Sequence, residues 1–240
     1  MKTITCVMAG IVVFFLTVKG PSAAVELTLV YTNSLNGRID TCDCPTNPRG
    51  GLIKRGTALK ELRRNNPNML LFESGDFITY EPDSLGSKYV VLAMKRLGYD
   101  AFSLGDQEFT LGVLHARKIA DELPVVCNNV MIKNGNSWSS PFPRHRIVER
   151  PGVKIGIIGV IGKGVFEYYP DSIKKSVRIG DEVSEIRKDV ASLKRKGATM
   201  IVLLSHMGMD RDKELQPKLD GVHVIVGGHT QNLIANPEIR

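Results

Sequence analysis

The chain has 240 residues, of which 42% are hydrophobic, 24% are charged and 6% are aromatic. These are ordinary globular proportions, so they exclude collagen-like, coiled-coil and wholly disordered chains. The length fits one domain with a full-sized core, or two small ones. The formal net charge of +7 indicates an anionic partner without saying which one.

The N-terminus has the pattern of a secretory signal peptide. Lys2 supplies a positive charge, residues 4–18 are almost entirely apolar, and residues 22–24 are small enough for cleavage. The apolar run is about 15 residues, which is short for a bilayer core of about 30 Å. We therefore expect residues 1–24 to be removed, leaving no stable membrane span. Residues 25–240 would then form one domain that is exported to the periplasm or the extracellular space, with an uncleaved membrane anchor as the alternative.

Short branched apolar runs alternate with helical patterns along the rest of the chain. The runs are flanked by turn residues, as buried strands are, and they lie at residues 27–31, 69–72, 101–104, 125–130, 154–161, 200–204 and 222–226. The clearest helix is expected at 181–196, where apolar residues recur at three- and four-residue steps before Gly197. Further helices are expected at 52–64, 88–97 and 113–123, and residues 134–143 read as a polar loop. This alternation predicts an α/β sandwich.

Side chains that can bind ligands follow the predicted strands repeatedly. They lie in five segments, at residues 33–37, 75–76, 105–108, 205–206 and 227–231. The carboxyl ends of strands are where α/β sheets place their sites, because several loops converge there. Neighbouring glycines let the backbone turn sharply and let a ligand approach closely. One such segment is a weak signal, but five in register along the chain predict a site.

These segments also carry a resemblance to a known family. Residues 30–33, 50–52, 70–76, 97–109, 123–130, 153–160, 203–208 and 222–230 resemble, in the same order, the 5′-nucleotidase branch of the calcineurin-like metallophosphoesterases. The resemblance implies a four-layer αββα sandwich, two metal ions and hydrolysis of phosphoesters, commonly of nucleotides, outside the cytoplasm. Family members continue with more strand, and many add a C-terminal substrate-binding domain. This sequence is expected to lack that domain, as a minimal version or as a fragment whose second sheet is incomplete.

Several positions depart from the family's motifs. The family opens with Asp-x-His, both metal ligands, where this chain has Ser34 and Asn36. Its Gly-Asn-His-Glu motif reads Gly-Asp-Gln-Glu here, so Asp106 replaces an amide ligand and Gln107 replaces the catalytic histidine. The final Gly-His-x-His motif ends in Gln231 instead of its second histidine. The resemblance therefore leaves the catalytic residue unassigned.

Sorting the family's ligands by metal ion leaves one complete set. The site built from the opening Asp and His, the bridging Asp and the last His retains only Asp76. The other site keeps its full set with one added negative charge: Asp76, Asp106, His206 and His229. Two imidazoles and two carboxylates suit a borderline divalent cation such as Mn, Fe or Zn. We expect a single divalent metal ion.

The resemblance and its departures predict a function. We expect an exported metal-dependent phosphoester hydrolase of the 5′-nucleotidase type, acting on a small anionic substrate such as a nucleotide. Its activity would be reduced or altered, since Gln107 cannot supply a proton and one ion clamps fewer oxygens than two. Nucleic acid is not an expected partner, because the basic runs lie on predicted helix faces without interleaved aromatics.

The cysteines leave alternatives open. Either of Cys42 and Cys44 could pair with Cys127 in a disulfide, act as a thiol or metal site, or remain unused. Five side chains are candidates to replace the missing ligands: Ser34, Asn36, Gln231, Cys42 and Cys44. The alternative function is a non-hydrolytic relative that binds metal or a ligand, or handles thiols and sulfur through the Cys-x-Cys loop.

Overall fold

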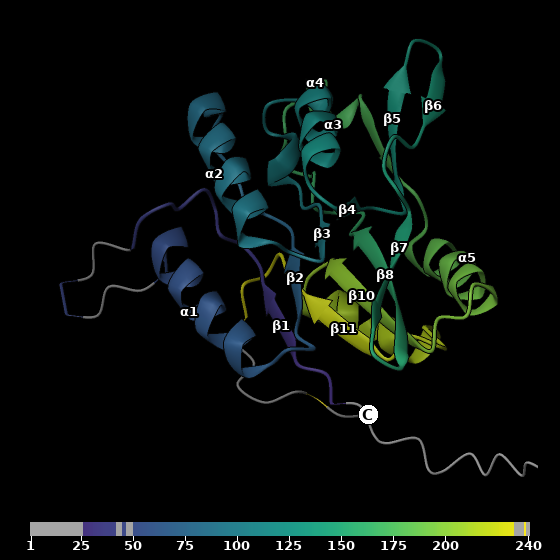
Figure 1. Cartoon of the computed structure of the whole chain (residues 1–240). Coiled ribbons are helices and arrows are strands. Elements are labelled where there is room, and N and C mark those ends of the chain that lie inside the picture. The colour runs from purple at the N-terminus through teal and green to yellow at the C-terminus, as the bar shows by residue number, and fades with distance from the viewer. Residues whose placement is uncertain (1–25, 42–44, 47–49, 233–237, 239–240) are drawn as a thin grey trace, which may run out of the picture.

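The computed structural model of the chain describes residues 26–41, 45–46, 50–232 and 238 (Figure 1). The expected signal segment and the residues Cys42 and Cys44 lie outside these ranges. Within them, no helix combines the length and the apolar character needed to cross a membrane.

Two sheets form the centre of the molecule. The first has the order β1-β2-β3-β4, all parallel: β1 (Leu29–Thr32), β2 (Leu70–Ser74), β3 (Ala101–Ser103) and β4 (Val125–Val126). The second has the order β11-β10-β8-β7: β11 (Val224–Gly227), β10 (Met200–His206), β8 (Val153–Ile161) and β7 (His145–Arg150). Only β7 runs antiparallel to its neighbour in this second sheet. A small antiparallel sheet has the order β6-β5-β9: β6 (Ser137–Ser139), β5 (Val130–Asn134) and β9 (Val177–Ile179).

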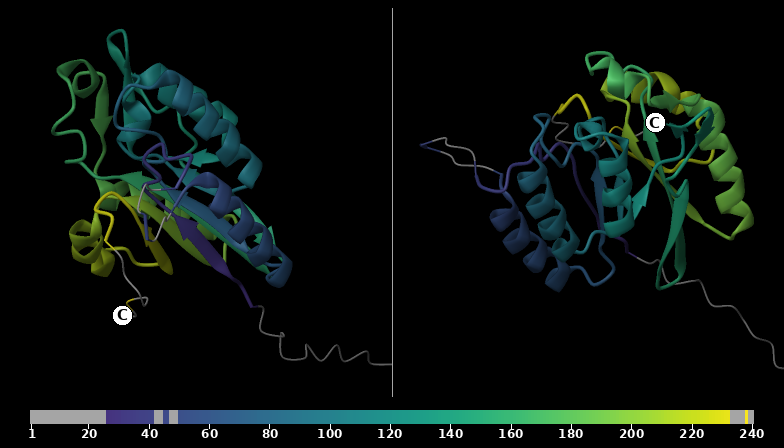
Figure 2. Two further views of the ribbon diagram at one scale, coloured as in Figure 1. Left: turned by 90° about the vertical axis from the view of Figure 1, so that its left-hand side faces the viewer. Right: turned by 90° about the horizontal axis from the view of Figure 1, so that it is seen from above.

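Helices cover the outer faces of the two large sheets (Figure 2). The first sheet carries α1 (Leu52–Asn65), α2 (Ser84–Leu97) and α3 (Val113–Glu122). The second carries α5 (Glu182–Arg195) and α6 (Met209–Leu215). Shorter pieces complete the chain: the 3₁₀ turn Gln107–Phe109, α4 (Asp171–Lys174) and the 3₁₀ turn Gln216–Lys218.

The apolar side chains separate into the interfaces that such layers require. Along β2, Leu70 and Phe72 point into the core between the sheets, whereas Leu71 points toward the helices. The same alternation on β10 sends Val202 toward the first sheet and Leu203 toward α5. Strands that are buried on both faces need continuous apolar runs, as the sequence has. The four-layer αββα sandwich is confirmed.

Several boundaries differ from the prediction. Helix α2 begins at Ser84, where the Asp83 side chain accepts a hydrogen bond from Gly86 N at 2.8 Å, rather than at residue 88. The sequence pattern does not reveal where α2 starts, because apolar residues lie on both faces of the helix. The run 125–130 divides between β4 and β5, and the expected polar loop 134–143 contains β6. A hairpin of polar residues lacks the alternating apolar signal that sequence patterns detect.

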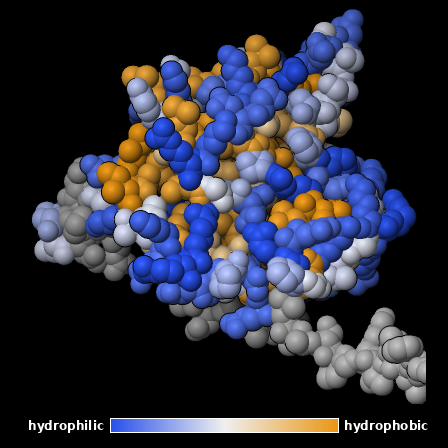
Figure 3. All heavy atoms as spheres, viewed as in Figure 1, coloured by the Kyte–Doolittle hydropathy of each residue, from blue (hydrophilic) through white to orange (hydrophobic). Residues whose placement is uncertain are grey.

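The outer face of α2 is an exposed apolar stripe (Figure 3). Leu85, Tyr89 and Leu92 recur at four- and three-residue steps, and all three side chains are exposed. Figure 3 shows hydrophobic colour in the region of this helix, whereas hydrophilic colour covers most of the α5 side.

A buried ion pair lies between the first sheet and its helices. Glu73 on β2 is fully buried; its Oε2 accepts a hydrogen bond from Thr32 Oγ1 at 2.6 Å and lies 3.3 Å from Arg55 Nη1. Its other oxygen has no hydrogen-bond partner. Burial raises the pKa of Glu73 to about 7, against the opposing effect of the Arg55 charge. Because the folded-state pKa is raised, the stabilisation it gives is present below the unfolded pKa near 4.5 and is lost as pH rises through about 7.

Replacing Glu73 by Gln removes this pH dependence. Relative to wild type, the unfolding free energy of Glu73→Gln should rise by up to about 3 kcal/mol between about pH 4 and about pH 8. Urea unfolding at both pH values measures it, with the exposed Glu61→Gln as the matched control. A difference between Glu73→Gln and wild type that stays constant with pH would contradict the prediction.

Candidate metal centre

Four potential ligands meet where strands of both large sheets end. Asp76 follows β2 and Asp106 follows β3, while His206 ends β10 and His229 follows β11. One ligand atom from each of the four lies within 4.8 Å of the others. The structure therefore brings together the four side chains that the sequence predicts to share one metal ion. Because the two sheets pack face to face, ligands distant in sequence become neighbours.

The cluster is buried on one side and open on the other. His206, Asp76 and Asp106 are buried, whereas about a third of the His229 side chain is exposed. His206 Nε2 lies 3.2 Å from Asp76 Oδ2 and 3.3 Å from Asp106 Oδ1. His229 Nδ1 lies 3.4 Å from the same Asp106 oxygen. A small ligand can therefore reach the cluster from the side of His229.

The proton arrangement of His206 fits a metal ligand. Its Nδ1 lies 2.6 Å from the carbonyl oxygen of Ser74, which can only accept, so Nδ1 donates a hydrogen bond there. In the neutral imidazole, Nε2 then carries a lone pair directed at the carboxylates. Neither His206 Nε2 nor Asp106 Oδ1 has a hydrogen-bond partner. A cation could satisfy these two buried ligand atoms, which lie 3.3 Å apart and make no hydrogen bond.

The electrostatics also favour a cation. Burial opposes a charge on His206, but the carboxylates of Asp76 and Asp106 raise its pKa well above 6.5. Without a metal ion, a proton on His206 neutralises part of the negative charge. A divalent ion bound to Nε2 would take the place of that proton.

Two glycines permit this close packing. A Cβ on Gly75 would lie 2.5 Å from Gly105 N and 2.6 Å from His206 Nδ1. A Cβ on Gly105 would lie 2.7 Å from His206 Nε2 and would also collide with the carboxylate of Asp76. Real Cβ atoms do not approach this closely, so any side chain at either position would displace His206.

Glu108 ties the two carboxylate-bearing loops together. Its Oε2 accepts hydrogen bonds from Gly105 N at 2.6 Å and Asp76 N at 3.1 Å. Its Oε1 accepts from Phe77 N at 2.9 Å and Ile78 N at 3.3 Å. Complete burial and the charge of Asp76 raise the pKa of Glu108 to about 8, although these N–H groups favour its charged form. Glu108 therefore orients the loops rather than facing the cluster.

Backbone strain marks the same positions. Ser34, Asn36, Asp76, His229 and Gln231 are the residues other than glycine with a positive φ in the described ranges, at 48° to 74°. Left-handed backbone is costly for such residues and concentrates at functional sites. All of them occupy positions at which the resemblance places metal ligands. Sequence patterns give no direct signal for this strain.

The vacated positions hold neutral side chains. Gln107 Nε2 donates to Asn36 Oδ1 at 2.9 Å, and Asn36 N donates to the Asp76 carbonyl at 2.9 Å. Ser34 Oγ and Gln107 Oε1 are buried without a hydrogen-bond partner. Gln231 is exposed. Among the described residues at the positions of this second ligand set, Asp76 is thus the one that carries a carboxylate.

Two further findings bear on the site. Tyr169, which no motif contains, donates from Oη to Asp106 Oδ2 at 2.9 Å. Cys127 is a fully buried thiol, free among the described residues, and its candidate disulfide partners Cys42 and Cys44 lie outside those residues. Burial raises the pKa of Cys127 to about 12, which keeps it an unreactive thiol.

Replacing Glu108 by Gln should loosen both loops. An amide keeps one accepting oxygen and turns an N–H₂ group toward two of the backbone donors. Leaving two buried N–H groups unsatisfied should lower the unfolding free energy by about 2–4 kcal/mol. Urea unfolding measures this loss, and the exposed Glu122→Gln serves as the matched control. Equal stability of the two variants would show that Glu108 does not hold the loops.

Known proteins share both sequence and fold with this chain. A snake venom 5′-nucleotidase from Gloydius brevicauda is 30% identical, in an alignment covering 95% of this chain and 40% of that protein. The 5′-nucleotidase precursor from Thermus thermophilus has a TM-score of 0.77 and 30% identity, over 88% of this chain and 43% of that chain. Calcineurin-like phosphoesterase YfkN from Bacillus subtilis has a TM-score of 0.74 over 88% of this chain and 74% of that chain; at 23% identity it supports the fold alone.

No protein-family model matches the chain. The chain spans about two fifths of the length of the curated relatives it matches. The relatives that match in sequence include 5′-nucleotidases of snakes and mammals. The structures that match in fold include 5′-nucleotidases, a calcineurin-like phosphoesterase and, at 18% identity, a sulfate thiohydrolase from Thermus thermophilus. By sequence and by fold, this chain is a relative of the 5′-nucleotidase branch of the calcineurin-like metallophosphoesterases.

Proposed function

We propose that this chain carries the metal centre of an exported phosphoester hydrolase of the 5′-nucleotidase type. The centre would take one divalent ion, Mn, Fe or Zn, and its ligands would be Asp76, Asp106, His206 and His229. The observation that carries the proposal is the convergence of four ligand atoms within 4.8 Å of one another, of which His206 Nε2 and Asp106 Oδ1 are buried without a hydrogen bond. Neutral residues at positions 34, 36 and 231 support one ion rather than two.

The surrounding residues define what the site would do. A divalent ion there supplies Lewis-acid polarisation of a phosphoryl oxygen. Substrate would enter beside His229, the most exposed of the ligand side chains. Gln107, whose Nε2 already donates to Asn36, can offer an oxygen but no transferable proton. The absence of general acid catalysis at that position should cost about 10²–10⁴ in rate.

The proposed substrate is a small phosphate ester. Nucleoside monophosphates come first, because the relatives that match in sequence are named 5′-nucleotidases. We do not propose nucleic acid as a partner for the basic residues of the helices.

Metal content and activity test the proposal together. Wild type expressed in defined metals should contain about one divalent ion per chain and hydrolyse nucleoside monophosphates or bis(p-nitrophenyl) phosphate slowly. Asp76→Ala should lose both properties, and the exposed Asp121→Asn should keep both. Two ions per chain, no ion, or hydrolysis unchanged in Asp76→Ala would contradict the proposal. Thiosulfate esters in the same panel test the sulfur-handling alternative.

Export rests on the apolar leader and on a relative found in snake venom, a secreted fluid. N-terminal sequencing of the secreted protein should start at Val25. Protein that keeps Met1 and stays with the membrane would instead support the anchored alternative.

A further inference from the structure

The two carboxylate oxygens of Asp106 have different neighbours. Oδ1 faces His206 and His229 and has no hydrogen-bond partner. Oδ2 accepts a hydrogen bond from Tyr169 Oη at 2.9 Å. A carboxylate that can rotate would exchange these oxygens, whereas one whose outer oxygen is bound to a fixed donor presents the same inner oxygen throughout.

The ring of Tyr169 is held on two sides. Phe166 contacts it edge to face, with ring centroids 5.4 Å apart and planes inclined by 72°. Tyr80, from the loop after Asp76, contacts it at 5.5 Å and 75°. Tyr169 is only 5% exposed. Edge-to-face pairs of this kind add stabilisation beyond their burial, so the phenol has a defined direction.

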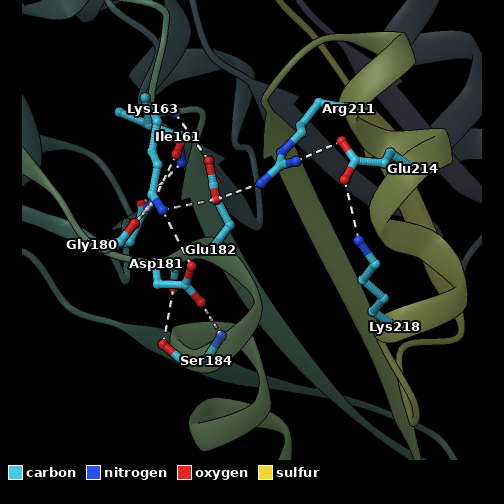
Figure 4. Close-up of polar contacts among 10 residues, drawn as sticks. Ile161, Lys163, Gly180, Asp181, Glu182, Ser184, Arg211, Glu214 and Lys218 are labelled. Atoms are coloured by element: carbon cyan, nitrogen blue, oxygen red, sulfur yellow. Dashed lines mark hydrogen bonds and ion pairs between the residues drawn. The ribbon is translucent and has the colours of Figure 1, made fainter.

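The loop that carries Tyr169 is anchored at its base (Figure 4). Lys163 N donates to Glu182 Oε1 at 3.1 Å, and Lys163 Nζ pairs with Asp181 at 3.2 Å. Arg211 of α6 pairs with the other oxygen of the buried Glu182 at 3.1 Å. Gly162 N also donates to the carbonyl of His206 at 3.1 Å. The loop is thus tied to the backbone of one proposed ligand and reaches the side chain of another.

The phenol of Tyr169 is a suitable hydrogen-bond donor for the charged carboxylate of Asp106. A phenol is protonated at neutral pH, so Tyr169 Oη donates to Asp106 Oδ2 at 2.9 Å. A carboxylate needs such a donor for its outer oxygen. The amide that the family carries at this position would turn its own N–H₂ group toward the phenol instead.

We propose that Tyr169 is a positioning residue for the metal centre: its hydroxyl holds Asp106 so that Oδ1 faces the ion. This inference rests on the proposed function, because it needs an ion to be bound. Tyr169 acts through Asp106 and makes no contact of its own with the ion.

Removing one hydroxyl tests this inference. Binding of Mn²⁺ to metal-free protein, measured by titration calorimetry, should weaken about 10- to 100-fold in Tyr169→Phe, as for other second-sphere partners. The matched control is Tyr168→Phe, which removes the same group from an 85% exposed neighbour and should leave affinity unchanged. A purely structural Tyr169 would alter unfolding of the metal-free protein but not the affinity of the folded protein.

A double-mutant cycle completes the test. If Tyr169 acts through Asp106, adding Tyr169→Phe to Asp106→Ala should weaken Mn²⁺ binding no further. Additive losses, or equal affinity of wild type and Tyr169→Phe, would overturn this inference while leaving the proposed function intact. A wild type that binds no Mn²⁺, Zn²⁺ or Fe²⁺ would overturn both.

Discussion

The hydrogen bond from His206 Nδ1 to the carbonyl of Ser74 is the interaction on which the site depends. It joins the end of β10 to the end of β2, and so connects the two sheets at the edge where the ligands gather. Because Nδ1 is occupied, Nε2 is the atom that faces the carboxylates. The bond requires that nothing larger than glycine stand at positions 75 and 105, beside the imidazole. The packing of His206 between the two sheets therefore restricts positions 75 and 105 to glycine.

Charge is the second constraint. The cluster places two carboxylates next to a fully buried imidazole, an arrangement that needs a proton or a cation to be tolerated. Next to Asp76, Gln107 Nε2 donates to Asn36 Oδ1, while Gln107 Oε1 is buried without a hydrogen-bond partner. Ser34 stands where the resemblance places a carboxylate ligand, so this position does not supply the negative charge that would favour a second divalent ion. The backbone of Asn36 is left-handed, with φ of 52°.

Much of this arrangement could be predicted from sequence, and the reasons are local. Continuous apolar runs between turn residues identified the buried strands, and glycines beside polar residues identified the loops that converge at their ends. The contribution of Tyr169 could not be predicted, since it arises from packing of Phe166 and Tyr80 around a residue that no motif contains. Strand β7 was also missed, because its charged residues mask the pattern of an edge strand. Long-range contacts of this kind leave no period in the sequence.

The most direct test of the account is to locate the metal. Crystals of the protein grown with Mn²⁺ should give one anomalous peak per chain, bounded by Asp76, Asp106, His206 and His229. A second peak beside Ser34 and Asn36 would contradict the single-ion account. No peak at the four residues, in crystals of protein that had bound Mn²⁺ in solution, would contradict the proposed ligands.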